Sequence, residues 1–99
     1  MEIKNRKFLV VGMGVSGVAA ARFLKRRGAE VTITDRAPAD RLKPHLAEVE
    51  DLGVKLELGG HSDESFAAVD VIVASPGVPL TIAPLRRAAE AGIPVMGEI

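Results

Sequence analysis

Cysteine and two of the three large aromatic residue types are missing from this chain. Its 99 residues contain no cysteine, tryptophan or tyrosine, and three phenylalanines. Disulfide bonds, thiolate nucleophiles and cysteine-ligated zinc are therefore excluded. The two histidines, His45 and His61, stand in unrelated contexts, whereas a metal site needs several ligands at suitable spacing. We therefore expect no metal site in this chain.

The chain also lacks an excess of charge of either sign. Lysine plus arginine and aspartate plus glutamate number 13 each, so the formal net charge is zero. Nucleic-acid binding and a polybasic membrane anchor both need a basic face, and this balance argues against them. The apolar run at residues 8–11 is too short for a signal sequence or a membrane span. The sequence predicts a cytoplasmic protein that binds neither nucleic acid nor membrane.

Strand patterns recur along the chain, and hydrophobic residues make up 47% of it, which is enough for a buried core. The strands are predicted from continuous apolar runs and from one alternating run typical of an edge strand. In chain order they occupy residues 8–11, 31–35, 54–58, 69–74 and 93–96. Ninety-nine residues with this content fit a single domain.

Helix patterns fill three of the gaps between these strands. The first helix carries the apolar stripe Gly17, Ala20, Ala21 and Leu24 and ends at Gly28, because the stripe has helical spacing and glycine favours a helix end. The other two patterns are a helix capped by Asp40 with the stripe Leu42, Leu46, Val49 and Leu52, and a helix marked by Leu85, Ala88 and Ala89. Alternating strands and helices imply a parallel sheet covered on both faces.

The fold class that follows is α/β, a Rossmann-like three-layer sandwich over residues 1–99. Right-handed crossovers favour a five-stranded parallel sheet in the order 3-2-1-4-5. The polar segment with His61, Asp63, Glu64 and Ser65 is interpreted as a solvated loop, because nothing in it pairs a nucleophile with a base. The chain stops just after its last strand, so we expect the N-terminal fragment of a longer protein.

The sequence Gly-Met-Gly-Val-Ser-Gly at residues 12–17 follows a predicted strand and opens a predicted helix, which is the context required of a dinucleotide-type motif. Gly12 permits the tight turn, Gly14 lets a diphosphate approach the backbone, and Gly17 lets the helix pack closely. The helix N-terminus attracts an anion through its free N–H groups. Ser16 adds a hydroxyl there, either for the ligand or to cap the helix. We predict diphosphate binding at this loop.

Two further segments follow strands whose ends should face this loop. Asp35 ends the second strand, where an acid either bonds ribose hydroxyls or accepts nearby amides in a turn. Arg36 is equally suited to a 2′-phosphate, a base or solvent. The turn Ser75, Pro76 and Gly77 follows the fourth strand at the expected switch point of the sheet, where ligands bind in such folds. We interpret both segments as ligand contacts.

Part of the machinery of an enzyme is absent from the sequence. It contains no Gly-x-x-x-x-Gly-Lys-Ser/Thr segment, and therefore no Walker-type ATP site. It also offers no nucleophile opposite a general base. The residues indicate a binding module that is not a complete active site, so we expect no catalytic residues and no cofactor within this chain.

Three segments together resemble one family, the D-glutamate-adding ligases of the Mur ligase family, over essentially the whole chain. They are the glycine motif with the following segment to residue 35, Ser-Pro-Gly-Val-Pro at 75–79, and Gly-Ile-Pro-Val-Met-Gly-Glu-Ile at 92–99. The resemblance implies the N-terminal domain that binds the UDP part of UDP-MurNAc-L-alanine in peptidoglycan synthesis. It implies further that ATP, Mg²⁺ and the catalytic residues belong to missing central and C-terminal domains.

The resemblance also assigns site residues. The diphosphate loop falls on Val15, Ser16 and Gly17 beside Gly14, the uracil-facing position on Asp35 and Arg36, and the turn beneath the uridine on Ser75, Pro76 and Gly77. Arg36 stands where some members carry a small hydroxyl residue. Two other functions remain open: the NAD(P)-binding half of an oxidoreductase, and a stand-alone nucleotide-sensing module.

Overall fold

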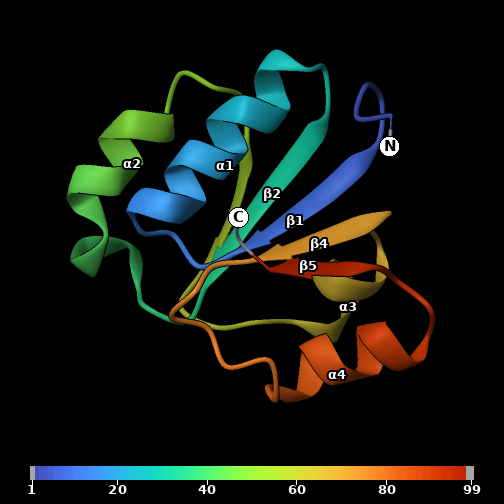
Figure 1. The fold of residues 1–99 in the computed structure, drawn as a ribbon. Helices are drawn as coiled ribbons and strands as arrows, with labels where there is room; N and C mark the ends of the chain where they lie inside the picture. Colours follow the sequence, from blue (N-terminus) through green and yellow to red (C-terminus); the bar gives the residue numbers. More distant parts are fainter. Residues whose placement is uncertain (1, 98–99) are drawn as a thin grey trace.

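A computed structural model describes residues 2–97 as three layers (Figure 1). The strands are β1 (Lys7–Val11), β2 (Glu30–Asp35), β3 (Lys55–Leu58), β4 (Val71–Ala74) and β5 (Val95–Gly97). The helices are α1 (Val15–Arg26), the 3-10 turn η1 (Ala39–Arg41), α2 (Lys43–Val49), α3 (Asp63–Ala67) and α4 (Ala83–Glu90). Helices α1 and α2 cover one face of the sheet, and α3 and α4 cover the other.

All strand pairs are parallel and the order is β3-β2-β1-β4-β5, which confirms the predicted fold class. The central strand β1 lies between β2 and β4 and is continuously apolar because both of its faces are covered. Phe8 and Val10 join the core beneath α1 and α2. Leu9 and Val11 join the second core beneath α3 and α4.

The first helix forms where its stripe predicts it. Gly17, Ala21 and Leu24 are buried against the sheet, and Ala20 packs at the edge of the same core. The helix ends as expected, because Gly28 adopts φ +87° in the left-handed region that glycine tolerates. The N-terminus of α1 lies shortly after the carboxyl end of β1, since three residues separate the two elements.

The structure corrects the prediction of a solvated loop around His61. Residues 63–67 form helix α3, and Ser62 caps it by accepting a hydrogen bond from the Ser65 N–H. Acidic residues stand in its first turn, where their negative charge interacts favourably with the helix dipole. Phe66 is buried in the core with Leu9. Five residues are too few to show helical periodicity, so the cap and one buried ring define this element.

The predicted cap at Asp40 is also wrong. Asp40 lies in η1, and α2 begins after Leu42 with no side-chain cap. Pro44 occupies the first turn of α2. Its fixed φ and missing N–H are tolerated there, because the N–H groups of the first turn have no partner within the helix. The residues of the predicted stripe do pack on one core, with Leu42 and Val49 buried. The helix is shorter than predicted, because Leu42 and Leu52 lie outside α2.

Two other expectations are refined. Strand β3 is the edge strand that was predicted, and Leu56 within it is 40% exposed. Residues Glu98 and Ile99 of the Gly-Ile-Pro-Val-Met-Gly-Glu-Ile segment lie outside the described residues. Among residues 2–97, no helix has the length and apolar content needed to span a bilayer.

Candidate functional site

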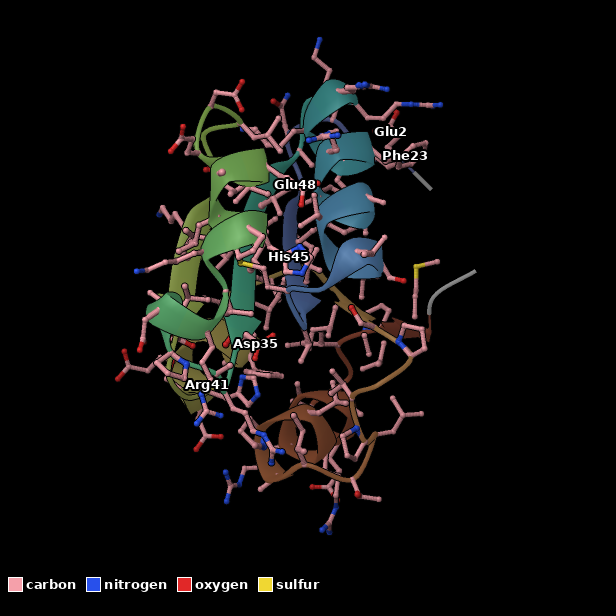
Figure 2. All side chains as sticks on the ribbon, turned by 90° about the vertical axis from the view of Figure 1, so that its left-hand side faces the viewer. Glu2, Phe23, Asp35, Arg41, His45 and Glu48 are labelled. Atoms are coloured by element: carbon pink, nitrogen blue, oxygen red, sulfur yellow. The ribbon has the colours of Figure 1, made fainter. Side chains whose placement is uncertain are left out.

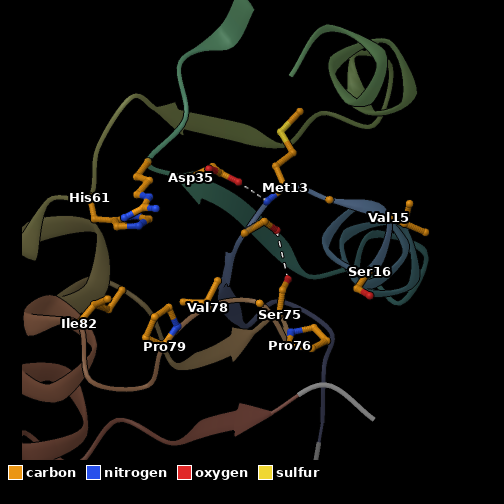
Figure 3. A pocket seen from close by; sticks show the side chains of 14 residues that line it. Met13, Val15, Ser16, Asp35, His61, Ser75, Pro76, Val78, Pro79 and Ile82 are labelled. Atoms are coloured by element: carbon orange, nitrogen blue, oxygen red, sulfur yellow. Dashed lines mark hydrogen bonds between the residues drawn. The ribbon is translucent and has the colours of Figure 1, made fainter. Parts of the chain in front are cut away.

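A cavity of about 560 Å³ lies at the carboxyl ends of the central strands, the position where α/β sheets of this type bind ligands. Every predicted site residue lines it except Gly17, which is buried beneath it. Figure 3 shows Val15 and Ser16 on one side, Asp35 above and Ser75 and Pro76 below. Figure 2 shows Asp35 below His45 and away from Glu2 and Phe23 at the upper right.

The glycine loop holds the start of α1 open toward this cavity. Gly12 has φ +101°, and its N–H donates to the Thr34 carbonyl oxygen at 2.7 Å, so the turn is tied to β2. Gly14 precedes α1 in extended conformation, and no side chain caps the helix. Ser16 therefore does not act as a cap. The N–H groups of the first turn are left for an anion, which the helix dipole also favours.

Gly17 fits only without a side chain. A Cβ atom built there would lie 1.9 Å from the carbonyl oxygen of Gly12. The helix and the glycine loop are thus in direct backbone contact, as predicted for the third glycine of the motif.

Asp35 organises the loop through both of its carboxylate oxygens. The N–H of Met13 donates to Oδ2 at 2.7 Å, and the N–H of Ala37 donates to Oδ1 at 2.8 Å. The second bond is the turn interaction that was one of the two interpretations of this residue. The first links the end of β2 to the glycine loop, and Asp35 still lines the cavity. A ligand contact by Asp35 stays a prediction.

The Ser75 turn is fixed to the glycine loop from the other side. The Ser75 hydroxyl donates to the Gly12 carbonyl oxygen at 3.3 Å, while its N–H donates to the Val11 carbonyl oxygen at 3.0 Å. The Val78 N–H closes the turn on the Ser75 carbonyl oxygen. Because both segments share these bonds, their spacing across the cavity is set by the fold.

Sequence reasoning missed several residues that also line the cavity. They are Met13, His61, Val78, Pro79 and Ile82. His61 is the polar one among them, and its Nδ1 lies 2.8 Å from the Thr34 hydroxyl. It comes shortly after the end of β3, and Asp35 is the last residue of the neighbouring β2. The rule that selected the ends of parallel strands could therefore have found His61 as well.

Glu57 joins β3 to the segment that carries His61. Its carboxylate accepts hydrogen bonds from the Ser62 N–H, from the Ser62 and Ser65 hydroxyls at 2.8 Å, and from the Thr34 hydroxyl. Burial raises the pKa of Glu57, but these bonds outweigh burial, so the pKa lies below its ordinary value of 4.5. The ionised form is therefore the one that the folded state favours.

Replacing Glu57 with glutamine is expected to lower stability at pH 7 by roughly 1 kcal/mol, the net size of a hydrogen bond. Because the folded-state pKa of Glu57 is depressed, its contribution is present above about pH 4.5 and is lost as the pH falls through the folded-state value. In urea unfolding at pH 7, 5, 4 and 3, the free energy of unfolding should fall less steeply with decreasing pH in Glu57→Gln than in the unaltered chain. The matched control is Glu90→Gln at the end of α4, and equal slopes in both variants would refute this role.

The arrangement suits binding of an extended anionic ligand. Amide groups at the start of α1 face one part of the cavity, while polar side chains of the β2 and β3 ends line another. Among residues 2–97, His, Asp and Glu side chains do not gather in threes as a metal site would require.

Comparison with known proteins identifies relatives of this chain. Residues 6–97 match the family described as Mur ligase MurD-like, N-terminal domain. The UDP-N-acetylmuramoylalanine–D-glutamate ligases of Desulfosudis oleivorans and Geotalea daltonii are 61% and 50% identical to this chain over all 99 residues. The chain spans 22% of the length of each of these relatives.

Solved structures place the fold more broadly. A pseudomurein peptide ligase type C from Methanothermus fervidus gives a TM-score of 0.74 at 29% identity, covering 93% of this chain and 19% of that one. D-lactate dehydrogenase from Escherichia coli gives 0.69 at 24% identity, covering 98% of this chain and 29% of that one. The second likeness shows a shared fold alone.

Proposed function

Because the chain belongs to the family of MurD-like N-terminal domains of Mur ligases, we propose that it binds the UDP part of UDP-MurNAc-L-alanine. The bound substrate would serve the D-glutamate-adding step of peptidoglycan synthesis in the cytoplasm. In this proposal residues 1–99 are one domain of a longer ligase.

The observation that carries the proposal is the cavity that joins the uncapped start of α1 to the Ser75 turn. The diphosphate would lie against the amides at Gly14, Val15 and Ser16, above the close contact made by Gly17. The uridine would extend toward Asp35 and Arg36, with Ser75, Pro76 and Gly77 beneath it. Backbone amides at a helix N-terminus favour two negatively charged phosphates.

The remaining chemistry of such a ligase would come from outside this chain. The described residues offer no cluster of metal ligands, and the sequence contains no phosphate loop for ATP. ATP, Mg²⁺ and the groups that activate the substrate carboxylate would therefore be held by further domains of a longer protein. No catalytic residue is assigned here, and the chain alone is expected to form no amide bond.

The oxidoreductase alternative shares the glycine motif and the fold. An NAD(P) ligand would also place a diphosphate at the start of α1, so this end of the cavity does not separate the two functions. The difference must arise at the base, where hydrogen-bonding groups matched to uracil would be left unpaired by a purine.

We expect UDP and UDP-MurNAc-L-alanine to bind at least about tenfold more tightly than NADH, since one unpaired buried group costs roughly 1–3 kcal/mol. NMR titration of the ¹⁵N-labelled chain with each ligand measures this ratio even when absolute binding is weak. Amide shifts should centre on residues 12–17 and 75–77. Tighter binding of NADH, with shifts centred on Asp35, would favour the oxidoreductase instead.

A further inference from the structure

We infer that His61 selects the base of the bound nucleotide by accepting a hydrogen bond at Nε2 from the imide N–H of uracil. The inference rests on the proposed binding of a uridine diphosphate group and names the side chain that distinguishes its base. The backbone amides of the glycine loop serve any diphosphate and cannot make this distinction.

The position of His61 fits the base end of the ligand. His61 lies beside Asp35 on one side of the cavity, and Val15 and Ser16 lie on the opposite side at the start of α1 (Figure 3). With the diphosphate at α1, the nucleoside must extend along the strand ends toward β2 and β3. That direction leads to Asp35, the last residue of β2, and to His61, shortly after β3.

The neighbours of Thr34 bear on which ring nitrogen of His61 carries the proton. The hydroxyl of Thr34, a fully buried residue, has a Glu57 carboxylate oxygen and the Gly60 carbonyl oxygen at 3.3 Å each. Both neighbours accept hydrogen bonds only. When the single hydroxyl hydrogen points to them, the 2.8 Å contact with His61 is a hydrogen bond donated by Nδ1–H to Thr34 Oγ1. Selection of the base by His61 requires this tautomer, in which the neutral ring carries a lone pair on Nε2.

The ring of His61 is also held in place. Phe66, a buried residue of α3, meets it edge to face, with ring centroids 5.7 Å apart and planes at 84°. The Thr34 bond and this contact fix the ring before any ligand arrives, which reduces the entropy cost of binding. Nδ1 of His61 bonds to Thr34, whereas Nε2 has no hydrogen-bond partner among residues 2–97.

A lone pair at this place suits an imide base. Uracil presents an N3–H donor between two carbonyl oxygens, whereas cytosine presents a bare ring nitrogen at N3. An acceptor on His61 therefore forms a hydrogen bond with N3–H of uracil, whereas it would face a second acceptor at N3 of cytosine and form none. The nearby carboxylate of Asp35 already accepts the N–H groups of Met13 and Ala37, and His61 offers a further acceptor at the same end of the cavity.

The test compares UDP with CDP, which differ only in the base. Calorimetry or NMR titration at pH 8 should show the unaltered chain binding UDP about tenfold or more tightly than CDP. In His61→Phe, which keeps a ring against Phe66, the ratio should fall close to one. The control is His45→Phe on α2, where His45 bonds to Glu48 away from the cavity; its ratio should stay unchanged.

A second measurement needs no substitution. In ¹⁵N spectra of the histidine rings, His61 should show the Nδ1–H form, and UDP should shift its Nε2 signal while inorganic pyrophosphate should not. A ratio near one in the unaltered chain, a full ratio in His61→Phe, or an Nε2–H ring would each overturn the inference about His61 while leaving UDP binding intact. Absence of any UDP binding by the unaltered chain would instead overturn the proposed function.

Discussion

Replacing Gly17 with alanine is expected to destabilise the domain by more than about 3 kcal/mol, a large part of the 5–15 kcal/mol that stabilises typical domains. The added methyl group would lie 1.9 Å from the carbonyl oxygen of Gly12. No rotamer change relieves this clash, because the backbone of residue 17 fixes the position of Cβ and the oxygen belongs to the backbone of Gly12. Alanine favours a helix by roughly 1 kcal/mol over glycine, which is too little to compensate.

Urea unfolding followed by circular dichroism measures this effect. The matched control is Gly14→Ala in the same loop, where a Cβ atom meets nothing within 4 Å and the extended backbone accepts any residue. The free energy of unfolding of Gly14→Ala should lie within about 0.5 kcal/mol of that of the unaltered chain, the range usual for surface substitutions. Equal stability of Gly17→Ala and the unaltered chain would show that α1 can shift away from the loop, contrary to the packing described above.

The sheet order and the start of α1 could be predicted from the sequence because local signals specify them. Continuous apolar runs indicate strands covered on both faces, and the spacing of Gly17, Ala21 and Leu24 indicates the buried stripe of α1. The turn at Ser75 was placed near the loop by topology alone, and the hydrogen bond from its hydroxyl to Gly12 is what joins them. The contacts of these residues with a ligand remain predictions.

Other features depend on contacts that the sequence does not display. Helix α3 is defined by the Ser62 cap and by burial of Phe66 against β1, a partner more than fifty residues away in the chain. The tautomer of His61 depends on Thr34 and Glu57, which lie on two neighbouring strands. Histidine in a polar segment is typical of a solvated loop, and only the paired strand ends bring it to the cavity.

Replacing Gly14 with valine is expected to weaken UDP binding strongly while leaving the fold intact. The valine side chain would enter open space at the mouth of the cavity, where the proposal places the diphosphate. Displacing the phosphates from the amides of α1 would remove one or two charge-assisted hydrogen bonds, at about 1.5–3 kcal/mol each. Affinity should therefore fall at least roughly tenfold, whereas loss of the glycine N-cap should cost less than about 1 kcal/mol of stability.

Titration with UDP and urea unfolding of the same samples separate the two effects. Gly97→Val on β5 is the matched control, because a Cβ atom there also meets nothing within 4 Å and Gly97 does not line the cavity at the glycine loop. It should change neither affinity nor stability appreciably. Since Gly14 and Gly17 stand three residues apart in one motif, a binding loss without unfolding at Gly14, beside unfolding at Gly17, would assign one glycine to the ligand and the other to the fold. Unfolding of Gly14→Val, or undiminished UDP binding by it, would contradict that division and move the diphosphate away from this loop.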